Sequence, residues 1–126
     1  MKLEEQVCSL ELAKKLKELG VKQESLFYWF NNWNGYAEGH PSKKENWILL
    51  DRYKDTGYPA FTVAELGETL PKTYYSGKSE KGILKYQCGS DDESRNKRHG
   101  WTRADTEADA RAKMLIYLIE NGLIKL

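Results

Sequence analysis

The sequence predicts an α+β protein in which residues 1–126 form a single domain. Three observations support this prediction: a capped helical pattern near the C-terminal end, a run of aromatic strand formers, and a hairpin pattern. We expect a small, mainly antiparallel sheet packed by an N-terminal helix, a short central helix and a long C-terminal helix. The length of 126 residues falls within the usual domain size of ~100–150 residues.

The N-terminal helix is predicted over residues 10–19, which read LELAKKLKEL. Ser9 is a suitable N-cap, because its hydroxyl can accept a hydrogen bond from a free backbone N–H of the first turn. Gly20 is expected to end the helix. Its apolar face consists of Leu12, Ala13, Leu16 and Leu19.

Two strands are predicted in the next part of the chain. Residues 25–30, SLFYWF, have the composition of a strand covered on both faces. Residues 36–45 are polar and predict a loop. Residues 46–53, NWILLDRY, are short for a helix and rich in strand formers, which favours a strand. We expect the GYPA sequence at 57–60 to break this second strand.

A capping box predicts the start of the central helix. Thr62 and Glu65 have the T-x-x-E spacing in which each side chain bonds the backbone N–H of the other. Phe61 and Leu66 form the matching hydrophobic staple. Pro71 is expected to end the helix soon after Leu70.

A β-hairpin follows, with strands predicted over residues 73–76 and 83–88. In the second strand, apolar and polar residues alternate, which indicates one buried face. Residues 89–100, GSDDESRNKRHG, are wholly polar and predict a loop. Residues 101–103 are expected to add a short strand that leads into the last helix.

The C-terminal helix has a clear start and end. Thr106 can cap it, and Asp109 stands where a carboxylate can reach back as in a capping box. Gly122 can take the left-handed conformation that ends a helix, with Leu123 folding back as its apolar contact. One face carries Ala108, Ala112, Leu115 and Ile119. Small residues permit close approach, so we expect this helix to lie on a sheet.

The composition limits the classes of function. Lys and Arg number 20 and Asp and Glu number 19, so the net charge is +1 and no basic field predicts non-specific nucleic-acid binding. No apolar run approaches the ~20 residues of a membrane span, and the N-terminal sequence lacks the apolar core of a signal peptide. Cys8 and Cys88 are expected to be reduced. We therefore expect a cytoplasmic protein without a membrane segment.

Parts of the chain resemble small uncharacterised proteins encoded by phages and prophages. The resemblance covers about half of the chain, in Val7–Trp29, Phe61–Pro71 and Ala104–Ile124. The second half is similar to the phage ABA-sandwich proteins, in which a short helix precedes two strands and an A-D-T-x-x-x-A phrase opens the last helix. That phrase is matched here by Ala104, Asp105, Thr106 and Ala110. The resemblance implies a prophage gene in a bacterial host and an α/β sandwich. It implies no activity, cofactor or catalytic residue.

The aromatic residues between 27 and 61 are more numerous than one small core requires. Trp33 is flanked by asparagines in a predicted turn, so we expect it to be exposed and able to stack on a base, a sugar or a partner side chain. Arg, Lys and aromatic side chains together would also suit nucleic acid. The candidate binding residues are therefore Trp33, Trp29, Trp47, Tyr53, Lys43, Lys44, Arg95, Lys97 and Arg98.

The sequence offers no catalytic or metal-binding pattern. His40 and His99 have no second histidine or cysteine at ligand spacing, so we expect no zinc site and no other metal or cofactor. Cys88 and His99 could form a nucleophile–base pair only if the fold joined them. A helix-turn-helix interpretation of residues 12–29 is disfavoured, because the spacing to Gly20 is too long and SLFYWF resembles a strand.

The leading functional hypothesis is a prophage-encoded binding protein that acts through protein–protein contact or self-association, and we expect no enzyme activity. The first alternative is a nucleic-acid-binding accessory protein that uses Trp33 and the cations named above. The second alternative is a small-ligand-binding protein or enzyme with an aromatic pocket.

Overall fold

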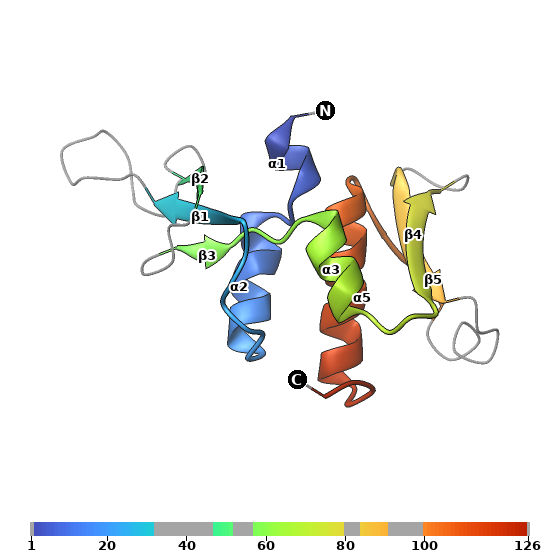
Figure 1. Ribbon diagram of the computed structural model, residues 1–126. Helices are drawn as coiled ribbons and strands as arrows, with labels where there is room; N and C mark the ends of the chain where they lie inside the picture. The colour runs from blue at the N-terminus through green and yellow to red at the C-terminus, as the bar shows by residue number, and fades with distance from the viewer. Residues whose placement is uncertain (1, 32–46, 52–56, 80–83, 91–99, 126) are drawn as a thin grey trace.

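A computed structural model describes residues 2–31, 47–51, 57–79, 84–90 and 100–125 of the chain. Three helices lie between two small sheets, one at each side of the molecule (Figure 1). The predicted α+β class is confirmed. The strands, however, are divided between two sheets, because the helices separate those of the first half from those of the second.

Two helices and three strands are found among the described residues of the first half. Helices α1 (Leu3–Gln6) and α2 (Leu10–Glu18) precede the sheet, in which β1 (Phe27–Asn31) lies between β2 (Trp47–Asp51) and β3 (Tyr58–Pro59). Both pairings are antiparallel, and Trp29 stands opposite Leu49 on one side and Tyr58 on the other.

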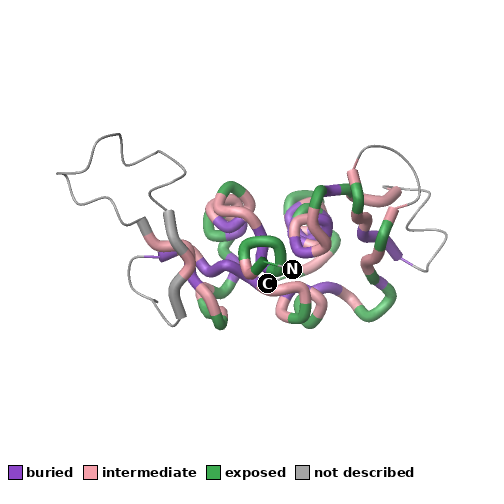
Figure 2. Tube along the Cα trace, turned by 90° about the horizontal axis from the view of Figure 1, so that it is seen from above, coloured by how far each residue is buried: buried purple, intermediate pink, exposed green. Residues whose placement is uncertain are grey.

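The second half contains the larger part of the core. Helix α3 (Val63–Thr69) is followed by the antiparallel sheet of β4 (Tyr74–Lys78), β5 (Tyr86–Ser90) and β6 (Thr102–Ala104), with β5 in the centre. Helix α5 (Glu107–Glu120) packs across all three strands and also contacts α2 and α3. In Figure 2 the buried residues gather in and between the central helices.

The predicted helix starts are confirmed by their hydrogen bonds. Ser9 Oγ accepts from Leu12 N at 3.5 Å. Thr62 and Glu65 form both bonds of the capping box, at 3.0 and 3.2 Å. Thr106 Oγ1 accepts from Asp109 N at 3.1 Å. These side chains satisfy backbone donors that have no partner inside their own helix.

The predicted helix ends are also observed. Gly20 and Gly122 have φ values of +86° and +66°, a region that glycine adopts without steric cost. The N–H of Leu123 donates to Leu118 O at 2.9 Å, which closes the last turn of α5. The Leu123 side chain remains 47% exposed, so it covers less of the helix end than we expected.

Helix α5 is buried around most of its circumference because it lies between the second sheet and the other helices. The buried residues are Ala108, Ala110, Ala112, Met114, Leu115, Ile116 and Leu118. Three alanines in the first half of the helix allow the close approach to the sheet that the sequence predicted.

One local prediction is wrong: strand β1 is not fully covered, because Tyr28 is buried whereas Phe27, Trp29 and Phe30 are partly exposed. Strand β2 ends at Asp51, before GYPA. Tyr58 and Pro59 of GYPA form a separate strand, β3, which pairs with β1 and which the sequence did not predict. Proline is tolerated there because β3 is an edge strand. The predicted hairpin is confirmed, although both strands are shifted toward the C-terminus: each ends two residues later than predicted, and they begin one and three residues later.

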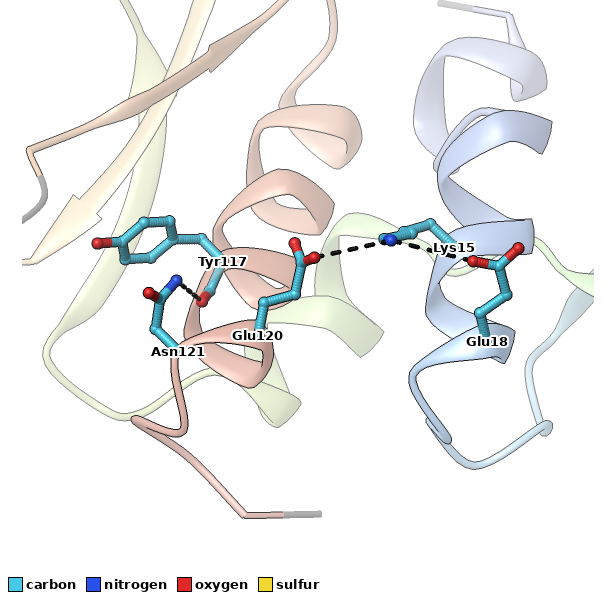
Figure 3. Close-up of polar contacts among 5 residues, drawn as sticks. All are labelled: Lys15, Glu18, Tyr117, Glu120 and Asn121. Atoms are coloured by element: carbon cyan, nitrogen blue, oxygen red, sulfur yellow. Dashed lines mark hydrogen bonds and ion pairs between the residues drawn. The ribbon is translucent and has the colours of Figure 1, made fainter.

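A polar contact joins the ends of α2 and α5 at the surface. Lys15 Nζ lies 3.9 Å from Glu18 Oε2 and 3.6 Å from Glu120 Oε2 (Figure 3). Asn121 Nδ2 donates to Tyr117 O at 2.8 Å beside it. Since these ion pairs are exposed, we expect each to stabilise the fold by at most ~1 kcal/mol.

Candidate binding cleft

An open cleft of about 800 Å³ lies beside α1. Figure 1 shows that α3 and α5 both begin at the end of the molecule where α1 lies. It is bounded by α1, the start of β1, the first turns of α3 and α5, and the start of β5. Its lining residues are Leu3, Glu5, Gln6, Phe27, Thr62, Val63, Ala64, Lys85, Tyr86, Asp105, Thr106 and Glu107. Its size is within the usual range of ~300–1,000 Å³ for ligand sites.

The lining combines apolar side chains with an excess of acids. Phe27 and Tyr86 supply aromatic surface from two different sheets. Glu5, Asp105 and Glu107 bring three carboxylates, whereas Lys85 brings one ammonium group. Glu107, in the first turn of α5, also offsets the positive end of that helix dipole. The cleft therefore favours an apolar occupant that carries positive charge.

Glu65 fixes the segment that precedes β1. Its Oε1 accepts from Ser25 Oγ at 2.9 Å, and its Oε2 accepts from Leu26 N at 3.3 Å. Ser25 Oγ also contacts Ala60 O at 3.3 Å. The carboxylate that caps α3 thus holds the start of β1 beside α3, which places Phe27 at the cleft. The adjacent Leu26 is 64% exposed.

A second network fixes the acidic side of the cleft. Ser76 Oγ donates to Glu107 Oε1 at 2.7 Å and accepts from Arg111 Nε at 2.5 Å. Arg111 Nη1 also donates to Val63 O at 2.8 Å, so one guanidinium connects α5, β4 and α3. Charge-assisted bonds of this kind are about twice as strong as neutral ones. Glu107 is consequently held in one position.

Gly67 provides the space that Arg111 occupies. A Cβ built on Gly67 would lie 2.0 Å from Arg111 Nη1 and 3.2 Å from Arg111 Cζ. Glycine inside a helix costs ~0.5–1 kcal/mol relative to alanine. Here it lets the guanidinium lie against α3, so that the network beside the cleft can form.

The two thiols are inert core groups. Cys8 and Cys88 are both buried and free, and burial raises the pKa of each thiol from 9.0 to about 12. They stay protonated at neutral pH, whereas a nucleophile or metal ligand needs the thiolate. Cys88 does not line the cleft.

Asp109 connects α5 with the start of α2. Its Oδ1 accepts from Ser9 N at 2.7 Å, across 100 positions of sequence. The carboxylate therefore serves a different helix from the one that the predicted capping box assigned to it. Burial raises the pKa of Asp109, although the bond from Ser9 N and the charge of Lys113 act in the opposite direction.

Most predicted site residues lie outside the described residues. These are Trp33, Lys43, Lys44, Tyr53, Arg95, Lys97 and Arg98, together with His40 and His99. Trp47 begins β2 opposite Asn31, but its side chain is also outside the description. Trp29 packs against the core, and its Nε1 donates to Cys8 O at 2.9 Å. It does not line the cleft.

Sequence reasoning missed the cleft, although it identified several of its parts. Thr62 and Thr106 were predicted as helix caps, and both line it. Phe27 and Tyr86 were assigned to strands without a binding role. The signal that would have found the site is the meeting of two helix starts, and this depends on how α3 and α5 pack together.

Over residues 2–31, 47–51, 57–79, 84–90 and 100–125, no three His, Cys, Asp or Glu side chains form a group that could hold a metal ion. Among the described helices, none has the length and apolar character that crossing a bilayer requires.

Comparison with known protein families, curated proteins and solved structures gives no match for this chain.

Proposed function

We propose that this chain is a prophage-encoded, cytoplasmic binding protein whose cleft receives a segment of a partner protein. The segment carries apolar side chains, which contact Phe27, Tyr86 and Val63, and basic side chains, which face the carboxylates. The observation that carries the proposal is the composition of the cleft, in which three acids and one lysine surround apolar surface.

Physical complementarity supports a protein segment as the occupant. Apolar contact supplies affinity of ~25 cal/mol per Å² of buried surface. Opposite charge raises the association rate and selects among partners. A phosphate-rich ligand would instead meet Glu5, Asp105 and Glu107, which disfavours nucleic acid in this cleft.

The cleft can be tested by selecting binders from a random-peptide display library with the purified full chain. We expect the enriched peptides to combine Lys or Arg with Leu, Ile or Phe. Asp105→Lys reverses one exposed charge at the cleft, and binding of the selected peptides should fall at least fivefold. Glu68→Lys is the matched control, because it makes the same charge change at an exposed position of α3 that does not line the cleft.

Two results would contradict the proposal. Enriched peptides that are acidic or lack apolar residues would exclude the proposed chemistry. Equal loss of binding in the Asp105 and Glu68 variants would show that overall charge, and not the cleft, determines binding. Thermal unfolding of both variants checks that each remains folded.

The prophage origin is supported by the resemblance of residues 7–29, 61–71 and 104–124 to phage-encoded proteins. In those proteins the A-D-T phrase opens the last helix. Here Ala104 ends β6 and Thr106 is the N-cap of α5, so the phrase stands at the same place. The genes that flank the coding sequence test this origin, and a neighbourhood of housekeeping genes without phage genes would contradict it.

A further inference from the structure

The second sheet has one face that no described helix covers. Helix α5 packs on the other face, where Ser76 contacts Arg111 and Thr102 Oγ1 donates to Ala110 O at 2.8 Å. Side chains alternate along a strand. The open face therefore carries Tyr75, Gly77, Gln87, Gly89, Trp101 and Arg103. Figure 1 shows that this face is turned away from the helices.

The strand register arranges these residues in two rows. Gly77, Gln87 and Arg103 pair across β4, β5 and β6 to form one row. Tyr75 pairs with Gly89 to begin the other row, and Trp101, the residue before β6, lies against Gly89. One row is thus aromatic, and the other offers an amide and a guanidinium.

Gly89 allows the Trp101 indole to rest on the sheet. A Cβ at Gly89 would lie 2.3, 2.5 and 2.7 Å from Cδ2, Cε3 and Cε2 of Trp101. Cδ2 and Cε2 are the two atoms shared by the fused rings, so the glycine lies beneath the ring face and not at its edge. The opposite ring face points away from the sheet.

Tyr75 extends this aromatic surface. Its ring centroid lies 5.2 Å from that of Trp101, with an angle of 81° between the ring planes. Tyr75 is 45% exposed, which is unusual for so large a side chain. Two aromatic rings at right angles on one sheet face offer a ring face and a ring edge to the same ligand.

The open face carries a cation and no acid. Of the residues assigned to it, Arg103 is charged and exposed, and none is acidic. Lys113 of α5 reaches the backbone of β6, where its Nζ donates to Arg103 O at 2.9 Å. This face differs from the cleft, where acids outnumber the single lysine.

We propose that the open face of the second sheet binds single-stranded nucleic acid. Bases stack on Trp101 and Tyr75, Gln87 offers hydrogen bonds to base edges, and Arg103 contacts the phosphate backbone. Aromatic stacking accepts any base and is worth ~1–3 kcal/mol for each base, and cations beside it hold the backbone. The exposed guanidinium of Arg103 and the absence of acids among the residues of this face favour this occupant over a basic peptide.

The experiment measures fluorescence anisotropy of a labelled oligothymidylate of about 12 nucleotides with the full chain at low salt. We expect single-stranded probe to bind more tightly than a duplex of the same length. Affinity should fall as salt rises, because bound cations displace counterions from the probe. Arg103→Gln should reduce the slope of log K against log salt by about 0.7.

Gly77 offers a matched pair of variants. A Cβ at Gly77 has no atom within 4 Å, so a longer side chain fits there without a clash at its base. Gly77→Glu places a carboxylate in the row of Gln87 and Arg103, whereas Gly77→Gln adds nearly the same volume without charge. We expect the Glu variant to bind oligothymidylate at least fivefold more weakly than the Gln variant.

Trp101→Ala adds a test of stacking and should weaken binding about fivefold or more. Circular dichroism and thermal unfolding check that each variant is folded. If Trp101→Ala does not fold, the comparison of the two Gly77 variants still tests the proposal. Absence of binding at low salt would overturn the proposal. Equal affinity of the two Gly77 variants for the probe would also overturn it. A third contrary result is binding of the probe that does not depend on salt and that is matched by binding of an uncharged proline-rich peptide. Peptide binding to the cleft is measured separately, so the two proposals can fail independently.

Discussion

Substitution of Gly67 by alanine tests the network that supports the cleft. In most helices this change stabilises the fold by ~0.5–1 kcal/mol, because alanine has the higher helix propensity. Here the new Cβ would lie 2.0 Å from Arg111 Nη1, so the guanidinium must move. Movement breaks at least the bond to Val63 O, which measures 2.8 Å.

The expected magnitude follows from these two opposing effects. A hydrogen bond from a charged group contributes ~1.5–3 kcal/mol, and subtracting the gain in propensity leaves a net loss of ~0.5–2.5 kcal/mol. At roughly 4 °C per kcal/mol for a chain of this size, the melting temperature should fall by about 2–10 °C. Thermal and urea unfolding of Gly67→Ala measure this loss.

A double-mutant cycle with Arg111→Ala identifies the cause. Once the guanidinium is absent, Gly67→Ala should stabilise the protein by ~0.5–1 kcal/mol, as in an ordinary helix. The coupling free energy between the two positions should therefore be ~1.5–3 kcal/mol. If Gly67→Ala has the same effect in both backgrounds, Arg111 is not the reason for the glycine and our account of this network is wrong.

Three further predictions concern the buried polar groups. The raised pKa of Asp109 means that the folded chain binds a proton more readily than the unfolded chain, so its ionisation lowers stability as the pH rises through the raised value. Asp109→Asn keeps an oxygen for Ser9 N, and its free energy of unfolding should exceed that of the wild type by an amount that grows as the pH rises above about 4, the pKa of an unfolded Asp; a difference that does not change with pH would contradict this. Because burial raises the pKa of Cys8 and Cys88 from 9.0 to about 12, their thiolate fraction at pH 8 falls roughly 1000-fold, and thiol reagents should label the native protein slowly and the denatured protein at once. Trp29→Phe removes the donor to Cys8 O and should cost ~1–2 kcal/mol in urea unfolding, whereas an unchanged midpoint would show that this bond is dispensable.

Local signals in the sequence predicted most of the helices and strands. The caps Ser9, Thr62 and Thr106 all accept the expected bonds, because capping depends on residues only three positions apart. Gly20 and Gly122 end their helices for a similarly local reason. Helix α1 was not predicted, and it has only four residues, no side-chain cap and no buried residue.

Long-range arrangements could not be predicted in the same way. The separation into two sheets depends on helix packing, and nothing in the strand sequences distinguishes one sheet from two. The partner of the Asp109 carboxylate lies 100 positions away, so local spacing favoured Thr106 instead. The edge strand of Tyr58 and Pro59 was missed because a proline normally indicates a break.

The candidate site was the least predictable part. The cleft joins residues from α1, β1, α3, β5 and α5, and no two of these segments are adjacent in the chain. The open face of the second sheet follows from alternation once the register is known, but Trp101 lies on it because Gly89 leaves room. Such a close approach is a property of the assembled sheet.

The hydrogen bond from Ser9 N to Asp109 has a consequence for the order of events during translation. A ribosome makes the N-terminal end first, so Ser9 is synthesised 100 residues before Asp109. Until then, the amide of Ser9 has water as its acceptor and α2 lacks the helix against which it packs. A nascent chain that stops before α5 therefore has the N-cap of α2 from its own sequence but lacks the Asp109 carboxylate that anchors this helix in the folded protein.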